Sequence, residues 1–190
     1  MDPVAPDSVR VLVVCTANQC RSPLAAATLS RRMEAAGVRA ETFSAGTNVK
    51  GRSPATPEAV NAARELWFDL GAHQSSPLDA DAVGRADLVL GMTRAHAREA
   101  VVLESAAYWR TFTLKELVRR GELRPRTNET LSDWLWALAS ERSPEELLGT
   151  APADDVADPI GQPLPVFRKT LTELDDLADR LVRVTWSKAS

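Results

Sequence analysis

One short segment holds the side chains best suited to chemistry. An apolar run precedes it, a helix start follows it, and it comprises Cys15, Thr16, Ala17, Asn18, Gln19, Cys20, Arg21 and Ser22. Backbone N–H groups at a helix N-terminus bind phosphate, and their positive field favours the thiolate form of a nearby cysteine. The guanidinium of Arg21 can hold two phosphate oxygens, and the Ser22 hydroxyl can donate to the sulfur. The segment therefore predicts a phosphate-binding loop with Cys15 as nucleophile.

A simpler interpretation exists for each cysteine, because free cysteine is among the most buried residue types. For Cys15, an arginine six residues later and a Ser-Pro helix start favour the functional interpretation over a buried strand end. Cys20 has two possible interpretations: a small residue packed in the core, or a redox partner of Cys15. The loop lacks the Gly-Lys-Ser/Thr of nucleotide-binding loops and also lacks G-x-G-x-x-G.

Strands and helices alternate along the chain and must position this loop. A β-branched apolar run at 9–14 predicts a buried strand, and Ser22 as N-cap followed by Pro23 predicts a helix start. Further strands are expected at 39–45, 87–92 and 108–113, and helices at 57–68, 79–85, 94–103, 114–120, 131–139 and 165–184. The alternation predicts an α/β fold: a single-domain three-layer sandwich with a four-stranded parallel sheet and helices on both faces.

Residues 1–190 are expected to form one domain, with a flexible N-terminus over residues 1–8. Residues 121–157 form an extended helix and loop segment, whose part after residue 140 is rich in proline, alanine and acidic residues and is predicted to be a loop. Trp134 and Trp136 lie two positions apart on a predicted helix. They must point to different faces, so one of them is expected to be exposed.

Composition excludes several classes of protein. The 190 residues carry a net charge of -3, which gives no reason to expect a nucleic-acid partner. No apolar run is long enough to cross a bilayer, and the first residues hold no signal core, so we expect a cytoplasmic protein without a membrane partner. Two neighbouring cysteines and two histidines allow neither a disulfide framework nor a four-ligand zinc site.

The sequence resembles the low-molecular-weight protein tyrosine phosphatase family, as a bacterial-type member. The loop matches its C-x5-R-S motif after the first strand, and three further segments agree: Ser44-Ala45-Gly46-Thr47, His73 within Gly71–Ser75, and Asp158-Pro159. The resemblance runs from Val9 to the last helix, and the four segments together are highly specific.

The resemblance implies hydrolysis of phosphotyrosine in proteins by a metal-free reaction that needs no cofactor. Cys15 attacks phosphorus and forms a phosphocysteine, while Arg21 and the loop N–H groups hold the phosphoryl oxygens. Asp158 protonates the leaving oxygen and then activates water. Asn18, a residue type that tolerates left-handed backbone, is implied to hold the loop through hydrogen bonds to Ser44 and His73. The implied partners are a phosphorylated protein and phosphate or another oxyanion, and the oligomeric state stays open.

Each supporting residue also has an ordinary interpretation. A single histidine such as His73 is more often solvated or at the core edge, and an Asp-Pro pair is usually only a turn. Asp154 and Asp155 compete with Asp158 as the acid, but neither is followed by proline. His96 is interpreted as structural.

Three departures from the family pattern leave the substrate open. Ala17 stands where glycine is usual and requires a negative φ, and Gln19 lies beside the expected substrate position. Ile160 stands where many members place an aromatic residue, so phosphoarginine is an alternative to phosphotyrosine. Thiol-dependent arsenate reduction is a further alternative function. It would need an external thiol as the reductant, because no cysteine follows Cys20 in the chain. A non-catalytic phosphate-binding module is disfavoured, because binding alone requires neither thiolate nor acid.

Overall fold

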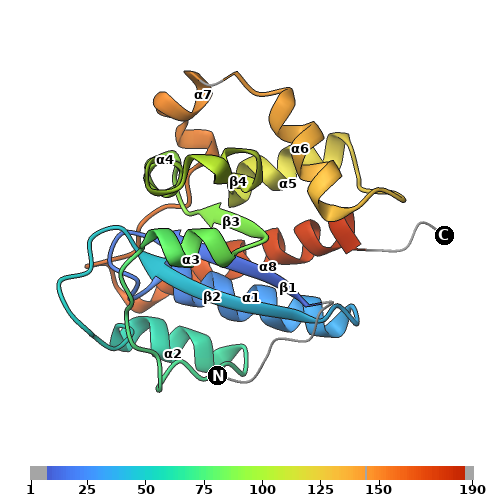
Figure 1. Cartoon of the computed structure of the whole chain (residues 1–190). Coiled ribbons are helices and arrows are strands. Elements are labelled where there is room, and N and C mark those ends of the chain that lie inside the picture. Colours follow the sequence, from blue (N-terminus) through green and yellow to red (C-terminus); the bar gives the residue numbers. More distant parts are fainter. Residues whose placement is uncertain (1–7, 144, 187–190) are drawn as a thin grey trace.

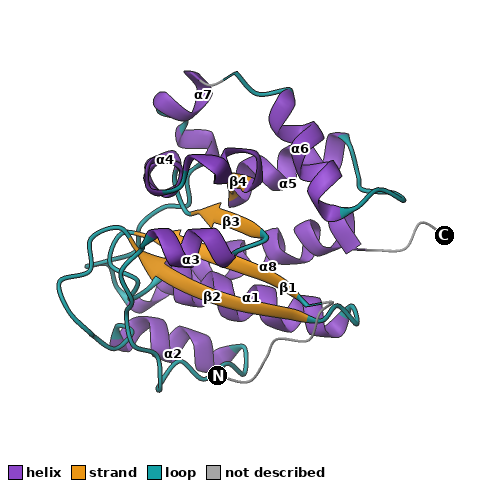
Figure 2. Ribbon diagram, in the orientation of Figure 1, coloured by secondary structure: helices purple, strands orange, loops and turns teal. Residues whose placement is uncertain are grey.

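Four parallel strands form the centre of the molecule, in the order β2-β1-β3-β4 (Figure 2). The computed structural model describes residues 8–143 and 145–186, so the predicted flexible N-terminus lies outside the described residues except for Ser8. The strands are β1 (Val9–Cys15), β2 (Ala40–Gly46), β3 (Leu88–Gly91) and β4 (Thr111–Thr113). The predicted four-stranded parallel sheet is confirmed.

Helices cover both faces of this sheet (Figure 1). Their bounds are α1 (Arg21–Ala35), α2 (Pro57–Glu65), α3 (Ala80–Arg85), α4 (Arg94–Leu103), α5 (Leu114–Leu123), α6 (Leu131–Ser140), α7 (Glu145–Leu148) and α8 (Leu164–Trp186). Two 3-10 segments, η1 (Ser105–Arg110) and η2 (Pro152–Asp154), complete the described elements.

Alternate residues of β1 point into two apolar cores, as the twofold repeat of a strand requires. Val11 and Val13 pack in the larger core with α1, α2, α5, α6 and α8. Leu12 and Val14 pack in the smaller core with α3 and α4. Because β1 is buried on both faces, its apolar run is continuous, which is typical of the central strand of a parallel sheet.

The helix after the first strand begins earlier than predicted, and the expected N-cap is wrong. Helix α1 begins at Arg21 with Cys20 at the N-cap position, and no side chain caps it. Ser22 lies inside the first turn, where its hydroxyl bonds to Cys15 and Asn18 instead of the helix amides. No side chain therefore caps the backbone N–H groups at the start of α1, which adjoins the loop.

Several other boundaries differ from the prediction, among them the end of α2 and the start of β4. Helix α2 ends at Glu65, because Trp67 adopts a left-handed φ of 64° and the amides of Trp67 and Phe68 bond back into the last turn. The run predicted as a strand at 108–113 is 3-10 helix up to Arg110, and only three residues join the sheet.

The segment after α5 contains more structure than the sequence indicated. Residues predicted as a loop between 141 and 157 include α7 and η2. In α6 the prediction for the tryptophans is confirmed, since Trp134 is fully buried and Trp136 is 62% exposed. The assignment of residues 1–190 to one domain stays a prediction. Within residues 8–143 and 145–186, no helix has both the length and the apolar character needed to cross a bilayer.

Candidate active site

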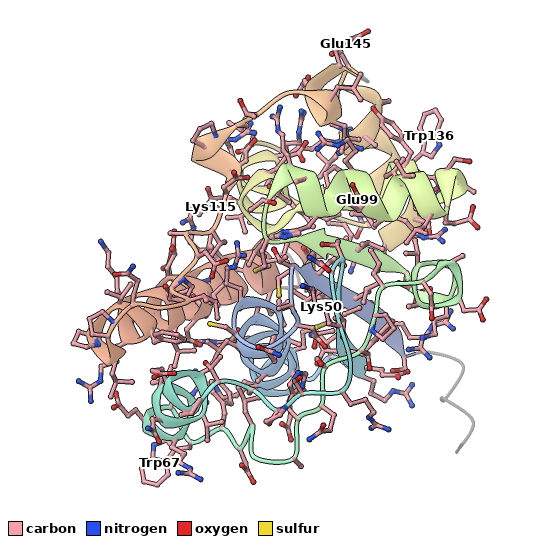
Figure 3. The ribbon with its side chains drawn as sticks, turned by 90° about the vertical axis from the view of Figure 1, so that its left-hand side faces the viewer. Lys50, Trp67, Glu99, Lys115, Trp136 and Glu145 are labelled. Carbon is pink, nitrogen blue, oxygen red and sulfur yellow. The ribbon has the colours of Figure 1, made fainter. Side chains whose placement is uncertain are left out.

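The loop between β1 and α1 lies at the carboxyl ends of the strands, where ligands bind in open α/β sheets. Figure 3 looks onto the side toward which the strand ends point, with Lys50 of a neighbouring loop near the middle of the view. A cavity of about 180 Å³ opens here. Its lining consists of Cys15, Thr16, Ala17, Gln19, Cys20, Arg21, Asp158 and Ile160.

The sulfur of Cys15 lies 3.0 Å from the hydroxyl oxygen of Ser22, and both residues are buried. The Ser22 oxygen accepts a hydrogen bond from the Asn18 side-chain amide at 2.9 Å, so its one proton remains to be donated. The Ala45 carbonyl, at 3.4 Å, is the other acceptor within reach. The shorter contact to sulfur favours Ser22 as the donor to the Cys15 sulfur.

Asn18 is fully buried, and all its side-chain polar atoms are paired. Its amide nitrogen donates to Ser22 and to the Ser44 hydroxyl at 2.8 Å, and its side-chain oxygen accepts the Ser76 N–H at 2.9 Å. Its backbone carbonyl lies 2.7 Å from His73 Nε2. Its φ of 54° is left-handed, which asparagine tolerates better than most residues. The structure thus brings Asn18, Ser44 and His73 together.

Backbone hydrogen bonds join the loop to the segment after β2. The Thr47 and Asn48 amides donate to the carbonyls of Cys15 and Thr16 at 2.9 and 2.8 Å. Gly46 permits this approach, because a Cβ there would lie 2.6 Å from the Thr16 carbonyl oxygen and 2.9 Å from the Asn18 nitrogen. Ala17 is not among the residues of positive φ, so it fits the loop without the glycine usual in relatives.

Arg21 and Asp158 meet directly across 137 residues of chain. Arg21 Nη2 donates to Asp158 Oδ2 at 2.5 Å, and Nη1 donates to the Val156 carbonyl at 3.2 Å. The Arg21 side chain is only 6% exposed, whereas that of Asp158 is 45% exposed and faces the cavity mouth. The thiol group of Cys15, the guanidinium of Arg21 and the carboxyl group of Asp158 therefore line one small cavity.

The two competing acids are occupied elsewhere. Asp154 is buried and forms ion pairs with Arg94 at 3.1 Å and with Arg119 at 3.2 Å. Asp155 accepts the backbone N–H of Arg94 at the start of α4. These contacts anchor the chain just before Asp158, and Arg94 also donates to the Glu146 carbonyl. Sequence reasoning missed this anchor, because ion pairs between distant residues leave no local pattern.

Cys20 lies in the larger core and is 3% exposed. Burial raises the pKa of its thiol, and the negative charges of Cys15 and Asp158 raise it further. Cys20 is therefore a protonated thiol, poorly suited to attack as a nucleophile. This favours the interpretation of Cys20 as a core residue, and its redox role stays a prediction.

His96 contacts the loop, which the sequence did not reveal. Its Nε2 lies 2.9 Å from the Thr16 hydroxyl and its Nδ1 lies 2.9 Å from the Thr93 hydroxyl. Burial, and then the positive charge of Arg21, lower the pKa of His96 to about 4, so the ring is neutral at pH 7. The available signal was its place just after β3, at the same sheet edge as the loop.

The chain is similar to known phosphatases in sequence and in structure. The family model for "Low molecular weight phosphotyrosine protein phosphatase" matches residues 10–123. A protein-arginine-phosphatase of Bacillus subtilis is 31% identical over 174 residues, covering 91% of this chain and 94% of that protein. The crystal structure of a low molecular weight protein tyrosine phosphatase from T. tengcongensis superimposes with a TM-score of 0.71 at 32% identity, over 93% of this chain and 99% of that one. The structure of a YwlE arginine phosphatase mutant with a phosphorylated active-site serine superimposes with a TM-score of 0.71 at 29% identity. The match covers 92% of this chain and 94% of that one.

Gly46→Ala tests the close approach of β2 to the loop. The added methyl group would push the Thr16 carbonyl and the Asn18 amide away, and such a displacement of a reacting loop typically costs about 100-fold in rate. Turnover of an aryl phosphate measures the loss. The matched control is Gly84→Ala in α3, where the new methyl meets open space and activity should be unchanged. Equal activity in the two variants would contradict this role for Gly46.

The depressed pKa of His96 makes folding stability depend on pH. In the unfolded chain His96 takes up a proton near its ordinary pKa, whereas in the native protein it stays neutral down to about pH 4. Acid therefore favours the unfolded state. The contribution of His96 to the free energy of unfolding is fully present above the ordinary pKa of histidine. Between pH 7 and pH 5 the protein should lose about 2 kcal/mol of this free energy. Urea unfolding of the wild type and His96→Gln measures this loss, and an identical pH dependence in both would exclude it.

Proposed function

The chain belongs to the low-molecular-weight phosphotyrosine protein phosphatase family, and we propose that it hydrolyses phosphotyrosine in proteins through a phosphocysteine at Cys15. The observation that carries the proposal is the convergence of Cys15, Arg21 and Asp158 on one cavity. A site that only binds phosphate needs neither a cysteine in contact with a hydroxyl group nor a carboxyl group at the same cavity.

The first step transfers the phosphoryl group to sulfur. The Cys15 thiolate attacks phosphorus, and the bond from phosphorus to the leaving atom breaks. Ser22 donates to the sulfur, the loop amides bind the phosphoryl oxygens, and Arg21 neutralises their charge. Arg21 has five N–H donors, of which contacts to Val156 and Asp158 use two, so others can reach phosphate oxygens.

In its protonated form, Asp158 supplies the proton that the leaving group needs. Its exposed carboxyl group borders the cavity, and the anchored chain before it holds it there. As the phosphocysteine hydrolyses, Asp158 takes a proton from the attacking water, and thiolate and phosphate are released. In the similar YwlE arginine phosphatase mutant an active-site serine is phosphorylated, which supports a phosphoenzyme formed on an active-site side chain.

Phosphoarginine is the second candidate substrate, for two reasons. The cavity is lined by Ile160 and, among the described residues, by no aromatic side chain that could stack on a phenol ring. The arginine phosphatase relative also matches almost the full length of this chain. The family name and the tyrosine phosphatase structure favour phosphotyrosine. Gln19 lies at the cavity wall, where its amide can contact either leaving group.

A cytoplasmic location belongs to the same proposal. A thiolate nucleophile must stay reduced, and the cytosol keeps cysteines in that form. The expected partners are a phosphorylated protein and an oxyanion in the loop.

Turnover of three phosphopeptides of one sequence, carrying phosphotyrosine, phosphoarginine or phosphoserine, tests this proposal. We expect kcat/KM for phosphotyrosine to exceed that for phosphoserine, whose serine oxygen is a poorer leaving group and reaches less far into the cavity. Preference for phosphoarginine would replace the named substrate and leave the mechanism standing. Cys15→Ser is the control and should abolish turnover of every peptide. Full activity in that variant would refute the mechanism.

A further inference from the structure

The proposed mechanism leaves the buried side chain of His96 unused, although it contacts the phosphate-binding loop. A chain of three side chains runs from the start of α4 to the loop: Thr93, His96 and Thr16. Both ring nitrogens of His96 are engaged at 2.9 Å. A histidine that only filled space would not require two matched hydroxyl partners.

The tautomer of His96 sets the direction of this chain. Thr93 Oγ1 caps α4 by accepting the His96 backbone N–H, and the same oxygen contacts His96 Nδ1. Both tautomers of His96 fit the two contacts, and in one of them the Thr93 hydroxyl donates its proton to Nδ1. His96 Nε2 then carries the ring proton and donates it to Thr16.

This direction leaves the Thr16 hydroxyl proton free. The Thr16 oxygen already accepts from His96, so its own proton needs an acceptor on the cavity side. The Thr16 side chain is solvent-exposed and lines the cavity together with Arg21 and Asp158. Its carbonyl is held by the Asn48 amide at 2.8 Å, so the residue cannot easily turn away.

We propose that Thr16 donates its hydroxyl proton to an oxygen of the phosphoryl group, and that His96 is a positioning residue that orients this hydroxyl. The inference rests on the proposed function for its setting, but it concerns oxyanion binding in the loop. The loop would then hold phosphate through backbone amides, Arg21 and one oriented hydroxyl. His96 suits this task because it is neutral, so it directs a proton without adding charge.

Calorimetric titration with inorganic phosphate tests the proposal independently of turnover. Thr16→Val removes the hydroxyl and keeps the shape, and it should weaken phosphate binding about 10-fold. Thr16→Ser keeps the hydroxyl and should recover most of that loss. His96→Leu should weaken binding to a similar degree, and His96→Gln, which retains a donor, should restore it in part. Glu99→Gln, on the exposed side of α4, is the control and should bind phosphate as the wild type does (Figure 3).

The double variant Thr16→Val/His96→Leu separates positioning from a structural role. If His96 acts only through the Thr16 hydroxyl, the double variant should bind phosphate no more weakly than Thr16→Val alone. Additive losses, or wild-type binding by Thr16→Val, would overturn the proposal. If His96→Leu fails to fold, the comparison of Thr16→Val with Thr16→Ser still decides, because Thr16 is exposed.

The same titration distinguishes this inference from the proposed function. If phosphate binding depends on Thr16 but no phosphopeptide is hydrolysed, the proposed function is refuted and the role of Thr16 in oxyanion binding stands. Turnover of a phosphopeptide by the wild type, together with unchanged phosphate binding in Thr16→Val, would keep the proposed function and refute the role of Thr16.

Discussion

The site depends on one buried residue, Asn18, whose side chain forms three hydrogen bonds while its backbone is held in a left-handed turn. Because its amide donates to Ser22, the one proton of that hydroxyl is directed to the Cys15 sulfur. Because the same amide donates to Ser44, the loop cannot move independently of β2. Each partner lost would leave a buried polar group unpaired, at a cost of about 1–3 kcal/mol. The loop is therefore preorganised before any oxyanion enters.

A second constraint holds the acid. The ion pair of Asp154 with Arg94 is largely buried, whereas its second partner, Arg119, is 52% exposed, and the two pairs fix the chain four residues before Asp158. Arg94 also begins α4, the helix that carries His96 to the other side of the loop. One helix start thus contacts both the proposed phosphate-binding loop and the segment that precedes the proposed acid. Part of the extended segment between residues 121 and 157 supports the active site through these contacts.

The parts that were predictable from the sequence are those with local patterns. The continuous apolar run of β1, the following C-x5-R-S and the alternation of elements predict the sheet and the place of the loop. Ser22 was misassigned as an N-cap, because the cap preference of serine says nothing of a thiol and an amide brought close by folding. The contacts of His96 and the pairs of Asp154 join residues far apart in sequence, so no local pattern encodes them. The first half of the strand predicted at 108–113 is 3-10 helix, since short apolar runs fit either structure.

The central claim is that Cys15 becomes covalently phosphorylated, and rapid-quench mass spectrometry tests it most directly. An aryl phosphate with a good leaving group should phosphorylate Asp158→Asn, in which hydrolysis of the intermediate lacks its base. The account predicts a transient species heavier by one phosphoryl group, with the added mass on Cys15 in the peptide that also contains Cys20. Turnover without any such species, or phosphorylation at another residue, would contradict it.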